Sequence, residues 1–580
     1  MNFKNIYSYT VKNIDSEYER YKGRDIVKDK NSSIYGKKAS FEMLYDTTEA
    51  GYIKILICTY YLKDGKYYKN PEILDKLEEA SRQLKDKLNE DGTDTLFVSN
   101  FQTPQQFGLQ AVGDGALVMK TYLDEKNEKE VKAFETLCMT VEKMAEGCLN
   151  GGFHTPNHRW VETSAMLLSY EVLKDTKFNK ICPALMKKSE MYLKEGVDCD
   201  EYGEWSERSA GMYNIHCDNA FLWIHHILKK DEYLDCICRN LMLMRYYIDP
   251  YDSSVFTQNS RRNDKGELGS VPLFNKGHTF YADDYIIPYM YAAYSKKDAF
   301  LASIAYKLFE NTQKFRRYFD NTVFMMFLHL PGLKDWEFEY TEDALPNTYD
   351  LYQPKSNIFR KKTDLGVYSY LANNPSFLQI EAQDFKMKMR MCSSFFAVAQ
   401  YHPEKMEKTD EGYSMTMTPY AEYKLPLENP DGVTTKDYWT IDYSKRKSIK
   451  ELTLIMNTEI VFTDENEFEI RYSVSGCDKV PTKLEFFVSP GMLCEIGDAV
   501  IMTNNGGNAF SKGEKVRFET REGIVVEIEG LLCNHLYSSD MRGSLDPIPG
   551  AFCLSATSFT PTSGKIKIKI SKTDSRRIFY

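Results

Sequence analysis

The chain has 580 residues, and 74 lysine and arginine residues against 84 aspartate and glutamate residues give a net charge of −10. This length supports more than one domain, each with a sizeable buried core. The composition, 42% hydrophobic and 27% charged, is typical of globular proteins and excludes the disordered and fibrous classes. The acidic balance argues against a general nucleic-acid-binding protein, which would carry a basic surface.

The sequence contains no pattern typical of a secretory signal or a membrane span. Its first 25 residues include no continuous apolar stretch, and the most apolar segment, 323–333, is too short to cross a bilayer. The 13 cysteines are odd in number and form no paired CxxC framework. We therefore expect a cytoplasmic protein with reduced thiols and no membrane partner. The alternative is a secreted or periplasmic protein whose signal has been removed.

Between residues 71 and 311, apolar residues recur every three or four positions, which predicts a series of helices separated by Gly, Pro, Asn and Asp. Helices of similar length joined by short and longer loops suggest stacked hairpins, either an open solenoid or a closed α/α toroid. The predicted helices are 71–88, 102–122, 128–148, 156–173, 180–195, 211–228, 231–247 and 282–294.

From about Trp336 onward the hydrophobic period is two, and turn clusters such as 429–432 and 504–507 separate the apolar runs. Many strands without intervening helices imply a large antiparallel β-sandwich. The acidic segment 334–355 is predicted to be a linker. We thus predict an α+β protein with a toroid domain at 1–335 and a sandwich domain at 336–580. The predicted strands are 365–371, 377–381, 386–395, 414–418, 452–457, 460–462, 468–474, 483–487, 516–520, 524–528 and 566–570.

The segment 151–160 is the first candidate site. A pair of glycines can end one helix there, and the Thr-Pro pair that follows can begin the next. Asn157, His158 and Arg159 then fall in the first helical turn, beside free backbone N–H groups and the positive end of the helix dipole. This pattern favours a carboxylate or phosphate site. The alternative is an ordinary helix start whose polar residues face solvent.

The loop 198–210 is acidic and aromatic, as expected of a loop that lines a cleft, and it leads into a helix predicted to start near Gly211. Tyr213 and His216 are three residues apart and share one face of that helix. A nearby histidine or cation could lower the pKa of the Tyr213 hydroxyl and make it a proton-transfer group. A packing role for this tyrosine is the alternative.

Two further polar segments contain candidate ligand-binding residues. Arg261 and Arg262 could hold a substrate carboxylate or sulfate through bidentate hydrogen bonds, or could face solvent. The segment 276–284 places His278 near two carboxylates, but no HxxxH or CxxC spacing supports a metal site. We predict neither a metal nor a cofactor. The absence of P-loop, GxGxxG, GxSxG and HExxH motifs argues against NTPases, dinucleotide enzymes, serine hydrolases and zincins.

These residues resemble motifs of the heparinase II/III-like polysaccharide lyases, which combine an incomplete α/α toroid with an antiparallel β-sandwich. Asn157 and His158 are similar to the Asn/His pair that neutralises a uronate carboxylate in that family. The run Asp200–Ser209 resembles the acidic loop of the family, whose tyrosine would be Tyr213. The HxHxD-like run of the family's sandwich domain is absent here, and His402 is the nearest candidate for a fourth catalytic residue.

The resemblance implies a lyase that cleaves a glycosaminoglycan- or alginate-like poly- or oligosaccharide by β-elimination without a cofactor. Asn157 and His158 would stabilise the charge that develops on the uronate, and Tyr213 would transfer the proton. An acidic saccharide is then the expected partner, with no nucleic acid and a possible homo-oligomer. The catalytic residues would be Asn157, His158, Tyr213 and His402, and the substrate-binding residues Arg159, Trp160, Trp205, Glu207, Arg208, His216, Arg261, Arg262 and His278, with both tryptophans stacking on sugar faces.

Two other functions are compatible with the sequence. A glycoside hydrolase of uronic-acid oligosaccharides could use paired carboxylates among Glu207, Asp283 and Asp284 on the same toroid. A non-catalytic glycan-binding protein would keep an aromatic cleft without proton chemistry. Substitution of Tyr213 separates the three, because only a lyase would lose turnover and retain binding.

Overall fold

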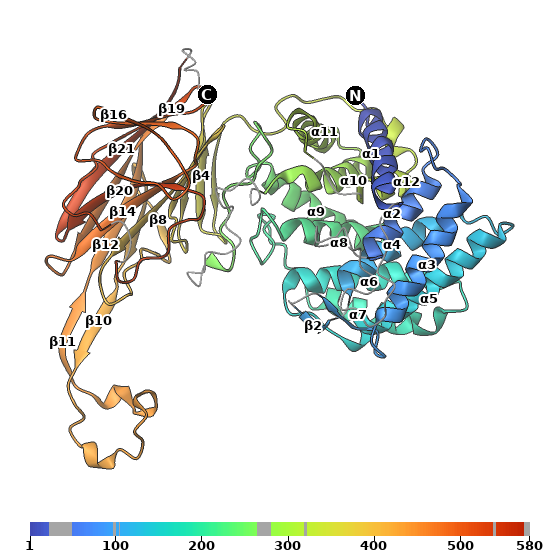
Figure 1. The fold of residues 1–580 in the computed structure, drawn as a ribbon, viewed down its shortest axis with the longest axis horizontal. Coiled ribbons are helices and arrows are strands. Elements are labelled where there is room, and N and C mark those ends of the chain that lie inside the picture. Colours follow the sequence, from blue (N-terminus) through green and yellow to red (C-terminus); the bar gives the residue numbers. More distant parts are fainter. Residues whose placement is uncertain are drawn as a thin grey trace. The chain divides into compact units, whose positions relative to one another are not determined.

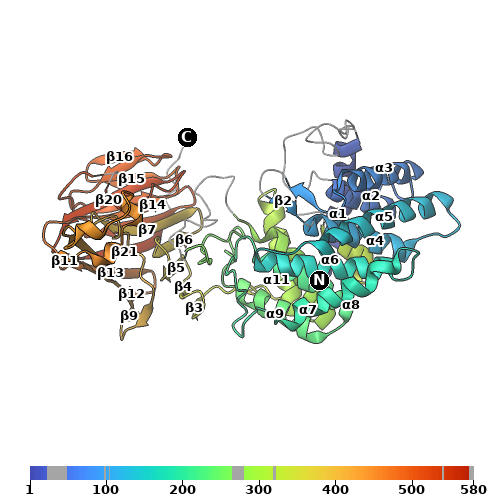
Figure 2. The same cartoon turned by 90° about the horizontal axis from the view of Figure 1, so that it is seen from below.

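The structure is a computed structural model that describes residues 1–22, 49–96, 100–103, 105–263, 280–317, 322–537 and 541–573. The chain divides into two compact units. The helical unit comprises Met1–Ser253 and Tyr281–Leu345, and the sandwich unit comprises Ser254–Phe280 and Pro346–Tyr580. Helices gather in the former and strands in the latter (Figures 1 and 2). The predicted fold class, an α/α toroid followed by an antiparallel β-sandwich, is confirmed.

The helical unit is a ring of paired helices. Its inner helices contact one another in chain order, and the last of them, α12, also contacts α2 and α4. These inner helices are α2 (Glu49–Tyr61), α4 (Gln106–Tyr122), α6 (Pro156–Leu173), α8 (Asn214–Leu228), α10 (Ile286–Lys296) and α12 (Thr322–His329). The outer helices are α1 (Lys4–Lys22), α3 (Pro71–Lys87), α5 (Glu128–Asn150), α7 (Cys182–Lys194), α9 (Asp231–Met244) and α11 (Ala299–Lys314).

Burial explains why the two rings differ in sequence. Every residue of α6 from Trp160 to Ser169 is buried, so its apolar residues are not confined to one face. The outer helix α3 instead buries one stripe that includes Ile73, Leu77 and Leu84. The predicted helix 102–122 is wrong at its start, because a short hairpin, β1 (Asp94–Leu96) with β2 (Asn100–Thr103), precedes α4. Helices α1, α2 and α12 lie outside the predicted helical region.

The sandwich unit consists of two large sheets that share one hydrophobic core. All neighbouring strands are antiparallel except β17 and β20. The nine-stranded sheet has the order β16 (Ala499–Met502), β15 (Leu493–Ile496), β18 (Val516–Glu519), β19 (Ile524–Glu529), β21 (Thr562–Lys572), β13 (Glu467–Ser475), β12 (Ile455–Asp464), β9 (Gly412–Met417), β8 (Met406–Lys408). The eight-stranded sheet has the order β17 (Asn508–Phe510), β20 (Phe552–Phe559), β14 (Pro481–Val488), β7 (Phe385–Ser393), β6 (Leu378–Ala382), β5 (Val367–Leu371), β4 (Ile358–Lys362), β3 (Tyr349–Gln353).

A separate ribbon of β10 (Tyr420–Lys424) and β11 (Ser448–Thr453) projects from the sandwich (Figure 1). In the described part of the chain, no helix has the length and apolar character needed to cross a membrane.

All thirteen cysteines are free thiols, and most are buried.

The chain crosses between the units more often than its sequence indicates. Residues 254–263 pack on the sandwich, where the Asn259 amide donates to the carbonyl oxygens of Ser356 and Ala372 at 2.5 and 2.6 Å. Residues 336–345 pack with the helices, where the Phe338 N–H donates to the Met1 carbonyl oxygen at 2.9 Å. The sequence-based division at residue 335 had assigned residues 254–263 to the toroid and residues 336–345 to the sandwich, the opposite of what the structure shows.

A buried ion network joins three inner helices. The side chain of Asp114 in α4 is 1% exposed, and its two oxygens lie 3.1 Å from Nζ of Lys54 in α2 and 2.7 Å from Nε2 of His329 in α12. Burial by itself raises the pKa of the Asp114 carboxyl, but Lys54 and His329 outweigh it and hold the pKa below its ordinary value. The stability that this carboxylate contributes is therefore present above its unfolded-state pKa and is lost as pH falls through the folded-state pKa.

The substitution Asp114→Asn tests the network. We expect it to lower the free energy of unfolding by about 3–5 kcal/mol at pH 7, because the buried ammonium of Lys54 loses the charge of Asp114. Urea denaturation measures the change. The exposed pair of Asp75 and Lys129, 2.9 Å apart, is the control, and Asp75→Asn should cost less than about 1 kcal/mol. Equal small losses in the two variants would contradict this assignment.

Candidate active site

Three inner helices begin side by side at one end of the ring. The ring centroid of Phe107, at the start of α4, lies 5.0 Å from that of His158 in the first turn of α6 and 5.3 Å from that of His216 in the first turn of α8. At the opposite end, Lys120 near the end of α4 donates to the carbonyl oxygen of Glu171 near the end of α6. Helices α4, α6 and α8 therefore run parallel, and the positive ends of their dipoles lie together.

These three helix starts lack the side-chain caps seen elsewhere in the described toroid. The cap residues of α4, α6 and α8 form no side-chain capping hydrogen bond. By contrast, Asn70, Asn127 and Asp298 cap α3, α5 and α11. A side-chain cap satisfies backbone N–H groups that otherwise have no acceptor within the helix. Helices α7 (Cys182–Lys194), α9 (Asp231–Met244) and α10 (Ile286–Lys296) also lack such a cap, so what distinguishes α4, α6 and α8 is that their starts lie together. Three adjacent helix starts are suited to an anionic ligand.

The protonation state of His158 is set by its surroundings. The amide nitrogen Nε2 of Gln106 lies 2.5 Å from Nδ1 of His158. With the amide as donor, Nδ1 accepts and the imidazole proton sits on Nε2. Burial, followed by the positive potential of His154 and His216, lowers the pKa of His158 to about 4. His158 is therefore neutral at pH 7 and offers an N–H donor at Nε2.

Asn157, the neighbour of His158, is held by a buried carboxylate. Its backbone N–H donates to Oε2 of Glu207 at 3.1 Å, and its side-chain amide donates to the same oxygen. Asn157 is 2% exposed and Glu207 is 1% exposed. The amide of Asn157 is thus engaged within the protein, whereas the sequence predicted that it would face the substrate. This pair fastens the loop 198–210 to the start of α6.

Tyr213 occupies the cap position of α8 and is half-buried. Its N–H donates to the carbonyl oxygen of Ser209 at 3.1 Å, and its own carbonyl oxygen accepts from the N–H of His216 at 3.1 Å. The helix begins at Asn214 and not near Gly211, because the intervening residues form a turn. That turn places Tyr213 at the same end of the ring as His158.

Both tryptophans of the predicted site are buried in the protein interior. Trp160 and Trp205 are 0% exposed. The Trp160 indole N–H donates to Asp198 at 2.6 Å, and that of Trp205 donates to Asp218 at 3.0 Å. The prediction that they stack on sugar faces is therefore wrong, because protein atoms enclose both rings.

Two arginines of the predicted site are also engaged by the toroid. The Arg159 guanidinium lies 4.0 Å from the Trp160 ring centroid, 3.3 Å from Asp198 and 3.2 Å from Glu195. Arg208 is buried, and its backbone lies in the left-handed region with a φ of 51°. The contacts of Arg159 give its side chain a structural function. The substrate-binding function of Arg208, which is buried, stays a prediction.

Two of the three carboxylates predicted for a glycoside hydrolase are engaged within the protein, and the third, Asp284, is exposed. Asp283 is buried and accepts from Arg317 at 2.6 and 2.9 Å and from Thr312 at 2.7 Å. Glu207 is held by Asn157. Within the described ranges, no group of three His, Cys, Asp or Glu side chains could hold a metal ion.

Other predicted residues lie in the sandwich unit or outside the described chain. Arg261 and Arg262 are half-buried in the segment 254–263. His278 lies outside the described residues. The substrate-binding functions of these three side chains stay predictions.

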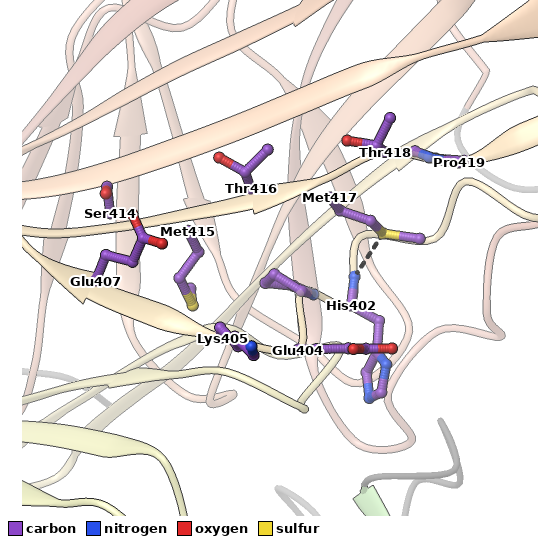
Figure 3. A pocket seen from close by; sticks show the side chains of 11 residues that line it. His402, Glu404, Lys405, Glu407, Ser414, Met415, Thr416, Met417, Thr418 and Pro419 are labelled. Carbon is purple, nitrogen blue, oxygen red and sulfur yellow. Dashed lines mark hydrogen bonds between the residues drawn. The ribbon is translucent and has the colours of Figure 1, made fainter.

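His402 lies beside a cavity of about 480 Å³ in the sandwich unit. Its Nε2 donates to the carbonyl oxygen of Asn263 at 2.7 Å. Its backbone N–H donates to the sulfur of Met417 at 3.2 Å, as Figure 3 shows. With Nε2 protonated, Nδ1 is the acceptor of this imidazole. Its catalytic function stays a prediction. The other residues that line the cavity are Pro403, Glu404, Lys405, Glu407, Ser414, Met415, Thr416, Thr418 and Pro419.

Sequence reasoning missed three residues at the shared helix end. Gln106 and Phe107 fell inside the helix predicted to begin at 102, so their first-turn position was hidden. His154, whose ring centroid lies 4.4 Å from that of His158, precedes α6 and was given no function. Recognition of the hairpin before α4 would have placed Gln106 and Phe107 in a first turn equivalent to that of His158.

No protein-family model and no curated protein sequence matches the chain. Among solved structures, it is similar over 98% of its length, and 79% of the other chain, to a chondroitin AC lyase from Streptomyces coelicolor A3, with a TM-score of 0.54 and 9% identity. It is also similar over 99% of its length, and 85% of the other chain, to a protein named heparinase III, with a TM-score of 0.50 and 12% identity. At these identities the likeness establishes the fold.

The substitution Glu207→Gln tests the contact with Asn157. We expect the free energy of unfolding to fall by about 1.5–3 kcal/mol, because two N–H groups lose a charged acceptor. Urea denaturation measures the loss. The exposed Glu201 of the same loop is the matched control, and Glu201→Gln should stay within about 0.5 kcal/mol of wild type. A Glu207→Gln protein as stable as this control would show that the contact adds nothing.

The pH dependence of stability tests the state of His158. Its folded-state pKa of about 4 lies below the ordinary value of 6.5, so the unfolded chain binds the proton first as pH falls. Wild type should therefore lose stability between pH 6.5 and 4, and His158→Gln should reduce that loss. The pKa can be read directly from the imidazole resonances by NMR. His154→Gln should raise it, since a neighbouring positive charge is removed. Titration of His158 near 6.5 in the wild type would contradict the assignment.

Proposed function

We propose that the helical unit carries the active site of a polysaccharide lyase that cleaves a uronic-acid-containing glycan, glycosaminoglycan- or alginate-like, by β-elimination. One observation carries the proposal: the neutral imidazole of His158 and the phenol of Tyr213 lie at the starts of adjacent parallel helices. An anion-binding end and a proton-transfer group thereby occur together. The similar solved folds include a lyase crystallised with chondroitin sulphate, so this fold can support such chemistry.

The carboxylate of the uronate would bind at the shared end of α4, α6 and α8. The proton on C5 is poorly acidic while the adjacent carboxylate keeps its full negative charge. The Nε2–H of His158 would donate to that carboxylate, and the three helix dipoles would stabilise the charge that grows as the proton leaves. Because His158 is already neutral, its donor is ready at pH 7 without a change of protonation.

Tyr213 would act as the general base and acid. In this scheme the base is the phenolate form of Tyr213. Its oxygen takes the C5 proton and becomes the phenol, the C5–H electron pair forms the C4–C5 double bond, and the C4–O bond breaks with its electron pair on the glycosidic oxygen. The departing glycosidic oxygen then takes a proton, which Tyr213 can supply. Proton transfer by a positioned side chain is worth about 10²–10⁴-fold in rate.

Asn157 and Glu207 would act as positioning residues in this scheme. Their contact fixes the first turn of α6, and Gln106 fixes the tautomer of His158. The scheme for the helical unit does not depend on Arg261, Arg262 or His402. No observation in the described residues favours the hydrolase or the non-catalytic glycan-binding protein over the lyase.

The substitution Tyr213→Phe tests the proposal. We expect wild type to raise the ultraviolet absorbance of a responsive uronic-acid glycan, since elimination leaves a conjugated double bond. Tyr213→Phe should lower the rate by about 10²–10⁴-fold without loss of glycan binding. Tyr202, exposed on the same loop, is the matched control, and Tyr202→Phe should keep wild-type activity.

Two results would contradict the lyase. Full activity in Tyr213→Phe would remove the tyrosine from the mechanism. New reducing ends without an increase in absorbance would identify hydrolysis.

A further inference from the structure

Strand β7 carries a buried layer of cations on the face that points away from the sandwich core. Met387, Met389 and Met391 face the core. Because side chains alternate along a strand, Lys388 and Arg390 face the other way. The segment 254–263 covers this outer face and, through the hydroxyl of Ser254, approaches the neighbouring lysine of β7.

The carboxylates on this face are already paired with other cations. Glu381 lies 3.3 Å from Arg360 and 3.6 Å from Lys386. Glu485 lies 2.8 Å from Lys483. Arg390 stands directly opposite Glu485 in the strand register, yet the two side chains form no ion pair in the described structure.

Lys388 and Arg390 thus form no ion pair in the described structure. Glu381 attracts the former, and Glu485 and Asp546 attract the latter, only at longer range. Lys388 is 1% exposed, and in the described part of the chain its ammonium contacts only the Phe256 ring, 4.6 Å from the centroid, with no hydrogen bond or ion pair. Arg390 is 0% exposed. Its Nε donates to Ser376 at 3.3 Å and its Nη1 to the carbonyl oxygen of Asp546 at 2.9 Å, but its Nη2 has no partner among described residues.

Two buried cations on one face of a strand are unfavourable unless Lys388 loses its proton or a ligand supplies the missing charge and acceptors. Burial and the charge of Arg390 lower the pKa of Lys388 to about 7, which is the response expected of an ammonium without a counter-ion. Gln379, directly opposite Lys388 in the register, also has an unpaired side-chain oxygen. Unsatisfied buried polar groups of this kind point to an ion or water held between them.

We propose that Lys388 and Arg390 form a binding site for a small oxyanion, a carboxylate or a sulfate group, beneath the segment 254–263. The oxyanion accepts from Nζ of Lys388 and Nη2 of Arg390, and a water molecule donates to the oxygen of Gln379. The group can come from a free ion or from an acidic sugar. The site belongs to the sandwich unit and does not rest on the proposed elimination reaction.

The test is the unfolding temperature of the whole chain as inorganic sulfate is increased at constant ionic strength. We expect a saturable rise of about 2–4 °C in the wild type, because an anion that binds only the folded state stabilises it. Lys388→Met removes the central donor and keeps the side-chain volume, so it should fold and should be more stable than wild type without sulfate. It should show only the small, non-saturating rise that sulfate gives any protein.

Lys569→Met, an exposed lysine on β21, is the matched control and should respond to sulfate as wild type does. A parallel titration with glucuronate distinguishes the source of the oxyanion: saturation by glucuronate alone identifies a sugar carboxylate, and saturation by sulfate identifies a free ion or a sulfate group. The proposal is overturned if Lys388→Met keeps the saturable rise. It is also overturned if neither sulfate nor glucuronate gives one in the wild type. The readout is binding, so an inactive enzyme leaves the outcome unaffected.

Discussion

The parallel packing of the inner helices is the constraint on which the candidate active site depends. Because helices alternate between the inner and outer rings, α4, α6 and α8 run in one direction and begin at the same end. Their dipoles therefore add at that end, and Phe107 brings the first turns of α6 and α8 to either side of one ring. In the proposed function, anion binding rests on the direction of the helices and not on a single residue. The side chains of His158 and Tyr213 would add the proton chemistry.

The same molecule uses buried charge in two ways. In the toroid, Asp114 is satisfied by Lys54 and His329, and Glu207 is satisfied by the N–H groups of Asn157. These carboxylates lie beside cations or N–H donors of the protein and hold helices or loops in place. In the sandwich, Lys388 lacks a partner in the described structure. The toroid carboxylates are explained by stability, whereas the two sandwich cations that form no ion pair are the basis of the proposed oxyanion site.

The sequence predicts the architecture well because the architecture follows from hydrophobic period. The change from a period near four to a period of two separates the units, and Pro156 marks the start of α6 correctly. The domain boundaries cannot be predicted from the hydrophobic period in the same way. The segment 254–263 follows the toroid helices in sequence, but it hydrogen-bonds to residues about 100 positions further along the chain. Such long-range contacts leave no local pattern in the sequence.

The candidate site was predicted in part, and its errors have a physical cause. The positions of His158 and Tyr213 near helix starts could be predicted because a helix start and a polar loop are local features, and their functions stay predictions. The orientation of Asn157 and the burial of Trp160 and Trp205 were missed, since they depend on Glu207 and on an inner ring that is apolar on most sides. An aromatic or amide side chain has the same appearance in a sequence whether it faces a ligand or the core.

The fate of the C5 hydrogen is the most direct test of the central claim that the toroid catalyses elimination. A uronic-acid glycan labelled with deuterium at C5 is incubated with the enzyme, and its products are examined by mass spectrometry. The account predicts that each cleavage yields an unsaturated sugar that has lost its deuterium. A cleaved product that retains the C5 deuterium and has gained the elements of water would contradict it.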